Sequence, residues 1–331
     1  MPAPPLLARV QEYGFELALC AHLEREREAV VSRQLGTSLH GRRVMDTVLV
    51  DPGPGFDDRA AITPETIPAP AIESDVGPGT ARYWKDAFDC HPDRAESVVE
   101  RAVELGFFER ERRGGRTYVR QSARYPDDWF ARLVGIENKP DLGRPGDLET
   151  QLRKDVSLGL LDAVVLATES YVTGAHLNRL PEAVGVWRFD PDTGEREVVR
   201  EPTPLSPDAT GIDVLERRSA RTEVRPVDAA AKARHRRRVA ERAYGKGWRT
   251  YDFPNCGEAE AAERFGAGGL PYCAWKERLV HPGAECGPDC AGYDPAEAPD
   301  VDLADERADG QPWRADPEGR QRRQSGLDRW S

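Results

Sequence analysis

The sequence predicts an α/β protein with a mixed sheet covered by helices on both faces. Segments with helical and strand-like periodicity alternate along much of the chain. The segments that read as central strands are almost entirely apolar, as expected for strands buried on both faces. No internal repeat is present.

The amino-terminal part predicts a helix and then a strand. Residues 6–30 carry apolar side chains at helical spacing. Residues 42–50 form a β-branched run that stops at an Asp-Pro-Gly-Pro-Gly turn, which predicts a strand with Asp46 inside it. The proline-rich residues 56–79 predict a loop.

Residues 61–125 predict a small inserted module that resembles a winged helix. Its expected elements are helices over 80–88 and 92–105 and strands over 107–112 and 116–121. Arg113 and Arg116 lie on the predicted wing and are candidates for nucleic-acid contact. Because the second helix is acidic, DNA contact and a purely structural role both remain open.

The sheet is predicted to resume after the insertion, so its core has two parts, 1–60 and 126–226. The expected elements of the second part are a strand over 132–137, a helix over 146–161 and strands over 163–168 and 184–189.

Residues 227–295 predict a basic helix over 229–243 and then a cysteine-rich segment. Arg236 and Arg237 on this helix are candidates for phosphate contact, although a solvated helix is an equal alternative. The acidic residues 296–331 lack apolar periodicity and predict a disordered tail.

The composition is acidic and poor in lysine. The formal net charge is −11, and six of the 47 basic residues are lysines. This pattern is typical of a high-salt cytoplasm, so the net charge does not exclude a nucleic-acid partner. The chain has no signal-peptide pattern and no apolar run of about 18 residues, which predicts a cytoplasmic protein without a membrane partner.

Glu137 and Lys139 stand at the end of a predicted buried strand and share one of its faces. A charged pair there is costly unless something neutralises it. Carboxylates from Glu137 and Asp46, with the carbonyl of Asn138, would suit Mg²⁺. The lysine would then orient or deprotonate an attacking water. A plain salt bridge at a strand end is the alternative.

Three segments, Arg43-Val-Met-Asp46, Ile136-Glu137-Asn138-Lys139 and Gln151-Leu-Arg-Lys-Asp155, occur in an order that resembles the PD-(D/E)xK nuclease superfamily. The resemblance is to its RecB-like branch, and to a haloarchaeal family of this type. It implies a restriction-endonuclease-like fold and a Mg²⁺- or Mn²⁺-dependent nuclease that acts on DNA.

Carried over by position, the resemblance implies Asp46 and Glu137 as metal ligands and Lys139 as the catalytic lysine. It places Gln151 near the site, with Glu16 on the first helix as an accessory acid. About ninety residues separate Asp46 from Glu137, whereas the superfamily usually joins these strands by a short hairpin.

A literal Pro-Asp pair ending at Asp127 makes this residue the alternative to Asp46. Two other kinds of function remain open. The chain could be a non-catalytic DNA-binding or regulatory protein, or an inactive nuclease fold that serves as a scaffold.

Four cysteines gather in a segment that is too poor in apolar residues to form its own core. Four thiolates suit Zn²⁺ or a 4Fe–4S cluster. The residues are Cys256, Cys273, Cys286 and Cys290. Some RecB-like nucleases take one cluster ligand from before the core, so Cys20 could replace Cys256; buried reduced thiols are the other alternative.

Overall fold

The computed structural model describes residues 6–39, 43–217 and 221–317, and the chain divides into two compact units. The first unit contains residues 1–51, 132–243 and 247–312, and the second contains 52–131, 244–246 and 313–331. The chain therefore leaves the first unit after Asp51 and returns to it at Arg132. Among the described residues, no helix is long and apolar enough to span a membrane.

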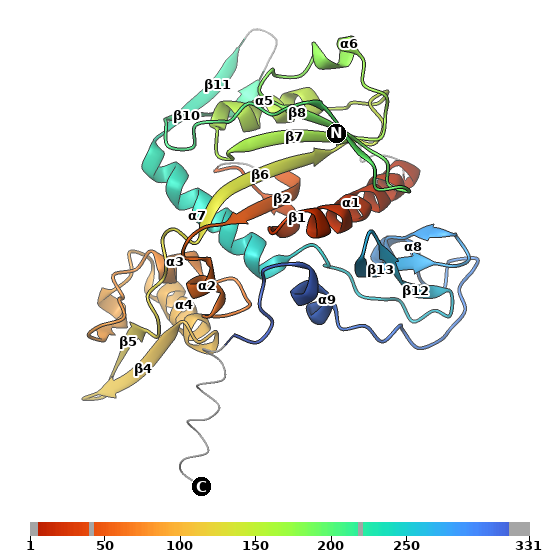
Figure 1. Cartoon of the computed structure of the whole chain (residues 1–331). Coiled ribbons are helices and arrows are strands. Elements are labelled where there is room, and N and C mark those ends of the chain that lie inside the picture. The colour runs from red at the N-terminus through yellow and green to blue at the C-terminus, as the bar shows by residue number, and fades with distance from the viewer. Residues whose placement is uncertain (1–5, 40–42, 218–220, 318–331) are drawn as a thin grey trace. The chain divides into compact units, whose positions relative to one another are not determined.

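A six-stranded mixed sheet with the order β1-β2-β6-β7-β8-β9 forms the centre of the first unit (Figure 1). The pairs β6–β7 and β7–β8 are parallel, and β1–β2 and β8–β9 are antiparallel. The strands are β1 (Val30–Gly36), β2 (Val44–Pro52), β6 (Phe130–Asn138), β7 (Ala163–Thr168), β8 (Gly185–Phe189) and β9 (Arg196–Arg200). The predicted α/β class with a mixed sheet is confirmed.

Helix α1 (Leu6–Glu26) buries an apolar surface against one face of this sheet. Phe15 and Leu19 of α1 pack in one cluster with Ile136 and Val165 of the sheet. Gly135 of β6 lets the side chain of Leu161 pack against the strand, because a Cβ at this position would lie 2.4 Å from that side chain. Leu161 comes three residues after the end of helix α5 (Leu148–Leu158). Helix α5 lies between β6 and β7 in the chain, which confirms the helix predicted over 146–161.

Strand β1 was not predicted, because the first helix was expected to extend to residue 30 and no element was assigned to residues 31–36. The helix ends at Glu26, and the polar side chains of the strand are buried by specific partners. Ser32 donates from its hydroxyl to the carbonyl of Gly247 at 2.9 Å. Arg33 pairs with Glu16 of α1 at 3.0 Å. A strand with such a surface has no apolar alternation to reveal it.

A second, three-stranded sheet packs on α1 through Ala267, Leu270 and Leu279. It consists of β12 (Ala259–Arg264), β13 (Ala267–Cys273) and β14 (Arg278–Leu279), and helix α8 (Pro282–Glu285) follows it. The hairpin β10 (Gly211–Arg217) and β11 (Thr222–Val227) precedes the basic helix α7 (Ala229–Lys246), which confirms the helix predicted over 229–243.

The tail predicted as disordered from residue 296 contains helix α9 (Leu303–Gly310), so this prediction is wrong for the described residues up to 317. Its order depends on buried polar groups rather than on an apolar stripe. The carboxylate of Glu24 on α1 accepts hydrogen bonds from Gln311 at 2.7 Å, Arg249 at 2.6 and 2.7 Å and Trp248 at 3.0 Å. Residues 318–331 of the predicted tail lie outside the described residues.

The second unit contains a helix followed by a β-hairpin, as predicted for the insertion. Its sheet has the order β3-β5-β4, and the proline-rich segment predicted as a loop includes two short helices. The elements are α2 (Phe56–Ala60), α3 (Ala69–Ile72), β3 (Arg82–Tyr83), η1 (Trp84–Asp86), α4 (Pro92–Glu104), β4 (Phe108–Arg113) and β5 (Arg116–Gln121). In place of the helix predicted over 80–88, the chain forms β3 and the turn η1.

Candidate functional site

The carboxylate of Asp46 lies at the end of β6, beside Glu137. Asp46 Oδ2 accepts a hydrogen bond from the backbone N–H of Asn138 at 2.8 Å. Because β2 and β6 are neighbours in the sheet, the two acids come together although about ninety residues separate them. The alternative acid, Asp127, is exposed and belongs to the second unit. Asp46 is therefore the acid that accompanies Glu137.

Burial disfavours the ionisation of both carboxyl groups, and the charge of Asp46 adds to this effect on Glu137. Burial, and secondly the charge of Asp46, raise the pKa of Glu137 to about 8, although Arg43 opposes the shift. Burial also raises the pKa of Asp46, against the effect of the Asn138 amide. Two acids that cannot easily be charged together are a common feature of catalytic and metal sites.

Arg43 joins Glu137 to an acid for which the sequence had suggested no role. Its Nη2 lies 2.7 Å from Glu137 Oε2 and 2.7 Å from Asp155 Oδ2. Its Nε also donates to both oxygens of Asp155, at 3.1 and 3.2 Å. Both carboxylates raise the pKa of Arg43. The guanidinium is thus a buried counter-ion between β6 and α5.

Gln151 lies one turn before Asp155 on α5 and is half-buried. Residues four apart share a helix face. The predicted helix face is therefore the one that approaches the site, but Asp155 is the residue whose contact with Arg43 is seen. The i, i+4 spacing to Gln151 was the signal in the sequence that could have identified it.

Glu16 reaches the site through the side chain of Gln34. Gln34 Nε2 donates to Glu16 Oε2 at 3.0 Å and to Asp46 Oδ1 at 3.2 Å. The backbone of Gln34 has a φ of 52°, a left-handed conformation that is costly for a residue with a side chain. The structure thus brings the predicted accessory acid into contact with the amide that also contacts Asp46. The strained residue Gln34 lies between Arg33 and Leu35, whose register partners Thr47 and Met45 flank Asp46.

Lys139 directly follows β6, and its side chain pairs with Glu12, a residue that the sequence analysis did not predict at the site. Its ammonium Nζ lies 2.5 Å from Glu12 Oε1 of α1. Its backbone N–H donates to the carbonyl of Ala167 at 2.9 Å, which extends the β6–β7 ladder by one residue. The lysine is therefore held at the strand end, with Glu12 as its counter-ion.

The donor chemistry of this carboxylate cluster suits a hard divalent cation, because Asp46, Glu137 and Glu16 offer only carboxylate oxygens. One oxygen of Glu137 is already bonded to Arg43. Within the described part of the chain, no three His, Cys, Asp or Glu side chains are spaced to hold a metal ion. Metal binding at Asp46 and Glu137 would therefore require Arg43 to move or Glu137 to use its other oxygen.

The cysteines form a separate group at one end of the β12-β13-β14 sheet. Cys256 and Cys273 are buried, Cys286 and Cys290 are half-buried, and all are unbridged. Burial, and to a lesser degree the neighbouring thiols of Cys273 and Cys290, raise the pKa of Cys286. Cys20, the predicted alternative, is instead a buried residue of α1 itself, with its sulfur 3.7 Å from the hydroxyl of Thr47.

The basic helix α7 uses part of its charge inside the protein. Arg236 is buried, and it donates to the carbonyl of Leu160 at 2.6 Å and to Asp162 at 2.7 Å. The prediction of Arg236 as a phosphate contact is therefore wrong, because its side chain links α7 to the segment between α5 and β7. Arg237 is half-buried.

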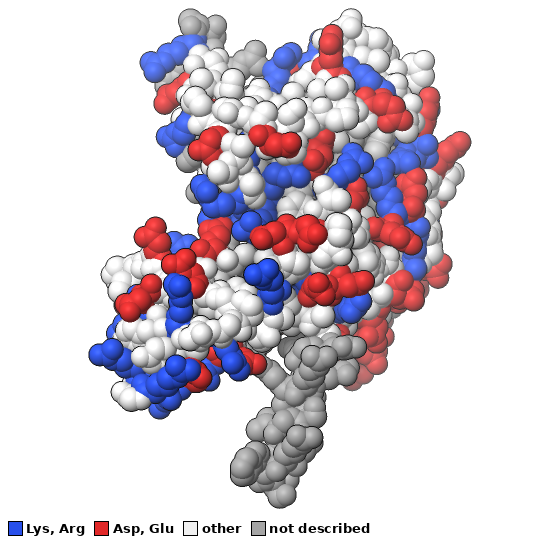
Figure 2. All heavy atoms as spheres, turned by 60° about the vertical axis from the view of Figure 1, so that its left-hand side comes forward, with Lys and Arg blue, Asp and Glu red and all other residues white. Residues whose placement is uncertain are grey.

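Arg113 and Arg116 are exposed on the β4–β5 hairpin of the second unit, as the predicted wing required. Arg113 pairs with Glu111 of the same strand, and its guanidinium lies 5.5 Å from the ring of Tyr118. On the face drawn in Figure 2, basic and acidic side chains are interspersed rather than segregated into one continuous basic surface.

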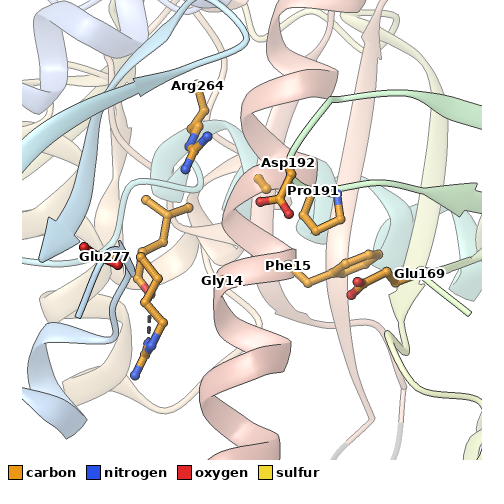
Figure 3. Close-up of a pocket in the computed structure, with 10 residues that line it drawn as sticks. Gly14, Phe15, Glu169, Pro191, Asp192, Arg264 and Glu277 are labelled. Carbon is orange, nitrogen blue, oxygen red and sulfur yellow. Dashed lines mark hydrogen bonds between the residues drawn. The ribbon is translucent and has the colours of Figure 1, made fainter. Parts of the chain in front are cut away.

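A cavity of about 390 Å³ lies on the other side of α1 (Figure 3). Gly14 and Ala18 line the cavity. Each is two residues away from Glu16, and a spacing of two residues turns a side chain about 200° around the helix axis, to the opposite side of α1. Burial, with the charges of Asp190 and Asp192, raises the pKa of Glu169 in the cavity wall. The cavity is thus distinct from the carboxylate cluster.

A family model described as "Family of unknown function (DUF5787)" matches residues 30–295 of the chain. No curated protein and no solved structure gives a significant match.

Proposed function

We propose that the chain, which belongs to this family of unknown function, is a metal-dependent nuclease of PD-(D/E)xK type that hydrolyses phosphodiester bonds in DNA. The restriction-endonuclease-like character of the sheet and the winged-helix character of the second unit are parts of the same proposal. The observation that carries it is the 2.8 Å contact between Asp46 and the Asn138 amide, which puts two carboxylates and Lys139 at one strand end.

A Mg²⁺ or Mn²⁺ ion bound by Asp46 and Glu137 would supply a Lewis acid and a water of lowered pKa. Gln34 orients Asp46 through its amide and keeps Glu16 within reach of the same site. Glu12 holds the Nζ of Lys139 at the strand end, where this amine can donate a hydrogen bond to a phosphate oxygen. These residues together position a scissile phosphate and stabilise the charge that develops on it.

Arginines beside the cluster support a polyanionic substrate. Arg242 of α7 donates to the carbonyl of Gly36 at 2.7 Å, at the end of β1. Gly36 is the register partner of Val44, the residue after Arg43. Burial and the nearby charge of Arg238 lower the pKa of Arg242. Two cations as close together as Arg238 and Arg242 favour the binding of an anion beside them, such as the phosphate backbone of a nucleic acid.

A second candidate function follows from Arg43. Its guanidinium already neutralises Glu137 and Asp155, so the cluster is internally compensated in the absence of a metal ion. A non-catalytic DNA-binding or regulatory protein would retain such a cluster for stability alone.

Cleavage of labelled single- and double-stranded DNA in high salt, with Mg²⁺ and with chelator, distinguishes the two functions. The wild type is expected to cleave in Mg²⁺, and Lys139→Ala to lose about 100-fold in rate. Arg153→Ala is the matched control, since Arg153 is exposed on α5 and pairs only locally with Glu149 among the contacts seen, at 3.0 Å. Equal rates for wild type and Lys139→Ala would overturn the nuclease proposal.

A further inference from the structure

We propose that Cys256, Cys273, Cys286 and Cys290 bind one zinc ion through four thiolates, as a structural site at the end of the β12-β13-β14 sheet. Tetrahedral coordination by four cysteines is a common form of structural zinc site. All four residues belong to the first unit. The inference does not depend on the nuclease proposal, because none of the four touches the carboxylate cluster in the contacts described above.

Backbone hydrogen bonds bring Cys256 to Cys273. Ala259 is the cross-strand partner of Cys273 in the β12–β13 ladder. The N–H of Ala259 also donates to the carbonyl of Cys256 at 3.0 Å. The ladder continues past both strand ends, because the N–H of Ala274 donates to the carbonyl of Glu258 at 2.9 Å. Cys256 and Cys273 therefore stand at the same end of the same pair of strands.

The turn that carries Cys290 is attached at this end as well. The carbonyl of Cys290 accepts from the N–H of Tyr293 at 3.0 Å, which closes the turn. The carbonyl of the next residue, Asp294, accepts from the N–H of Gly257 at 2.7 Å. Because Gly257 directly follows Cys256, this hydrogen bond holds the turn that carries Cys290 next to Cys256.

Cys286 follows α8, and side-chain contacts hold this helix against the β13–β14 turn. Glu285 accepts hydrogen bonds from Lys276 at 3.2 Å and from Arg278 at 2.5 Å. Lys276 is the third residue after Cys273, so the end of α8 is fixed beside the strand end that carries Cys273.

The loops that carry the cysteines are short and rich in glycine. The apolar residues of these strands face α1, and the loops around the cysteines contain glycines and the half-exposed Trp275. Gly292 packs so closely against Trp275 that a Cβ there would lie 2.2 Å from its ring. A segment with so small a core usually needs a cross-link or a metal ion.

The thiols themselves are not yet in coordination geometry. Among the residues that the structure describes, no three His, Cys, Asp or Glu side chains are spaced to hold a metal ion. Zinc binding therefore requires the thiols to rotate toward a common point, at about 2.3 Å from each sulfur, while the backbone contacts hold the four segments in place.

Metal analysis of the full-length protein, purified under reducing conditions without chelator from zinc-supplemented cells, tests the site. The wild type is expected to contain about one zinc per chain. Cys256→Ser and Cys290→Ser should each bind zinc at least about tenfold more weakly. Cys90→Ser is the matched control, because Cys90 is a half-buried thiol of the second unit and should leave the zinc content unchanged.

A measurement on the wild type avoids the question of whether a variant folds. Exchange of the bound ion for Co²⁺ should give the intense sulfur-to-metal absorption and the visible bands of a tetrahedral thiolate site. Titration with a mercurial reagent should release the metal as the thiols react. Absence of zinc from the wild type, undiminished zinc in Cys256→Ser, or iron with acid-labile sulfide in its place would overturn the proposal.

Discussion

Arg43 Nη2 lies 2.7 Å from Glu137 Oε2, so a guanidinium contacts the carboxylate that we propose as a metal ligand. Asp155 holds the same nitrogen at 2.7 Å from the other side. A cation of the protein and a divalent metal ion would thus compete for Glu137, while Asp155 could keep Arg43 close after its release.

Removal of this guanidinium should make the protein depend on metal for stability. Without metal, Arg43→Met is expected to lose about 3 kcal/mol in free energy of unfolding, because it leaves buried Asp155 without its counter-ion and Glu137 without its hydrogen-bond donor. Added Mg²⁺ should restore much of this loss and raise the melting temperature of the variant more than that of the wild type. Arg153→Ala, an exposed arginine on α5, should change stability by less than about 0.5 kcal/mol. An equal response to Mg²⁺ in Arg43→Met and the wild type would show that no metal ion competes with Arg43.

The pH dependence of stability should report the carboxyl pair. The pKa of Glu137 is about 8 in the folded chain, against an ordinary 4.5, so the protonated acid favours folding. Its stabilising contribution is complete below about pH 4.5 and is lost as the pH rises to about 8. In chelator, the unfolding free energy of the wild type should therefore fall relative to that of Glu137→Gln across this range, by no more than about 1.4 kcal/mol per pH unit. Parallel curves for the two proteins would contradict the raised pKa.

Two substitutions of Gln34 should separate the role of its side chain in cleavage from the effect of its backbone conformation on stability. Gln34→Gly and Gln34→Ala both remove the amide that joins Glu16 to Asp46, so each should lower the cleavage rate to a similar extent, roughly tenfold. Only glycine relieves the left-handed backbone, so the glycine variant should be more stable than the alanine variant by about 1 kcal/mol. Denaturant unfolding and cleavage assays on the two variants separate these effects. Normal cleavage by both would exclude a positioning role for Gln34.

Glu24 should be among the most sensitive positions outside the site. Its buried carboxylate binds Arg249, Trp248 and Gln311, so Glu24→Ala leaves a buried guanidinium without its partner. A loss of about 3–5 kcal/mol in unfolding free energy is expected by chemical denaturation. Glu28→Ala, an exposed acid beyond the end of the same helix, should change it by less than about 0.5 kcal/mol. A loss in Glu24→Ala no larger than that in Glu28→Ala would mean that the contacts of Glu24 do not stabilise the tail.

The elements that the sequence predicted well are those with a strong local signal. The apolar run of β7 was predicted over the same residues, Ala163–Thr168, because a buried strand needs only apolar side chains to be recognised. Asp46, Glu137 and Lys139 could be proposed from short motifs because each has a charge on or at the end of an apolar strand. The sequence favoured Asp46 over Asp127, because the ten residues from Asp127 to Glu137 leave little room for a strand, a turn and another strand, but it left Asp127 as an alternative.

Other features depend on contacts between distant residues and have no local signal. Strand β1 and helix α9 are ordered by buried polar partners, Gly247 for Ser32 and Glu24 for Gln311. Arg236 looked like one more arginine on a basic helix, and only its contacts with Leu160 and Asp162 show it to be structural. Local patterns record which side chains avoid water, whereas the partner of a buried charge is chosen by the tertiary fold.

For this chain, the sequence by itself determined an α/β core, an inserted module and a set of acids with one lysine at the strand ends. Only the tertiary structure decided that Arg43 neutralises Glu137, that Asp155 and Glu12 join the site, and that Gln34 links Glu16 to Asp46. The physical reason is that a buried carboxylate must be paired within about 3 Å, and the nearest donor in space can lie more than ninety residues away in the chain, as Arg43 does from Glu137.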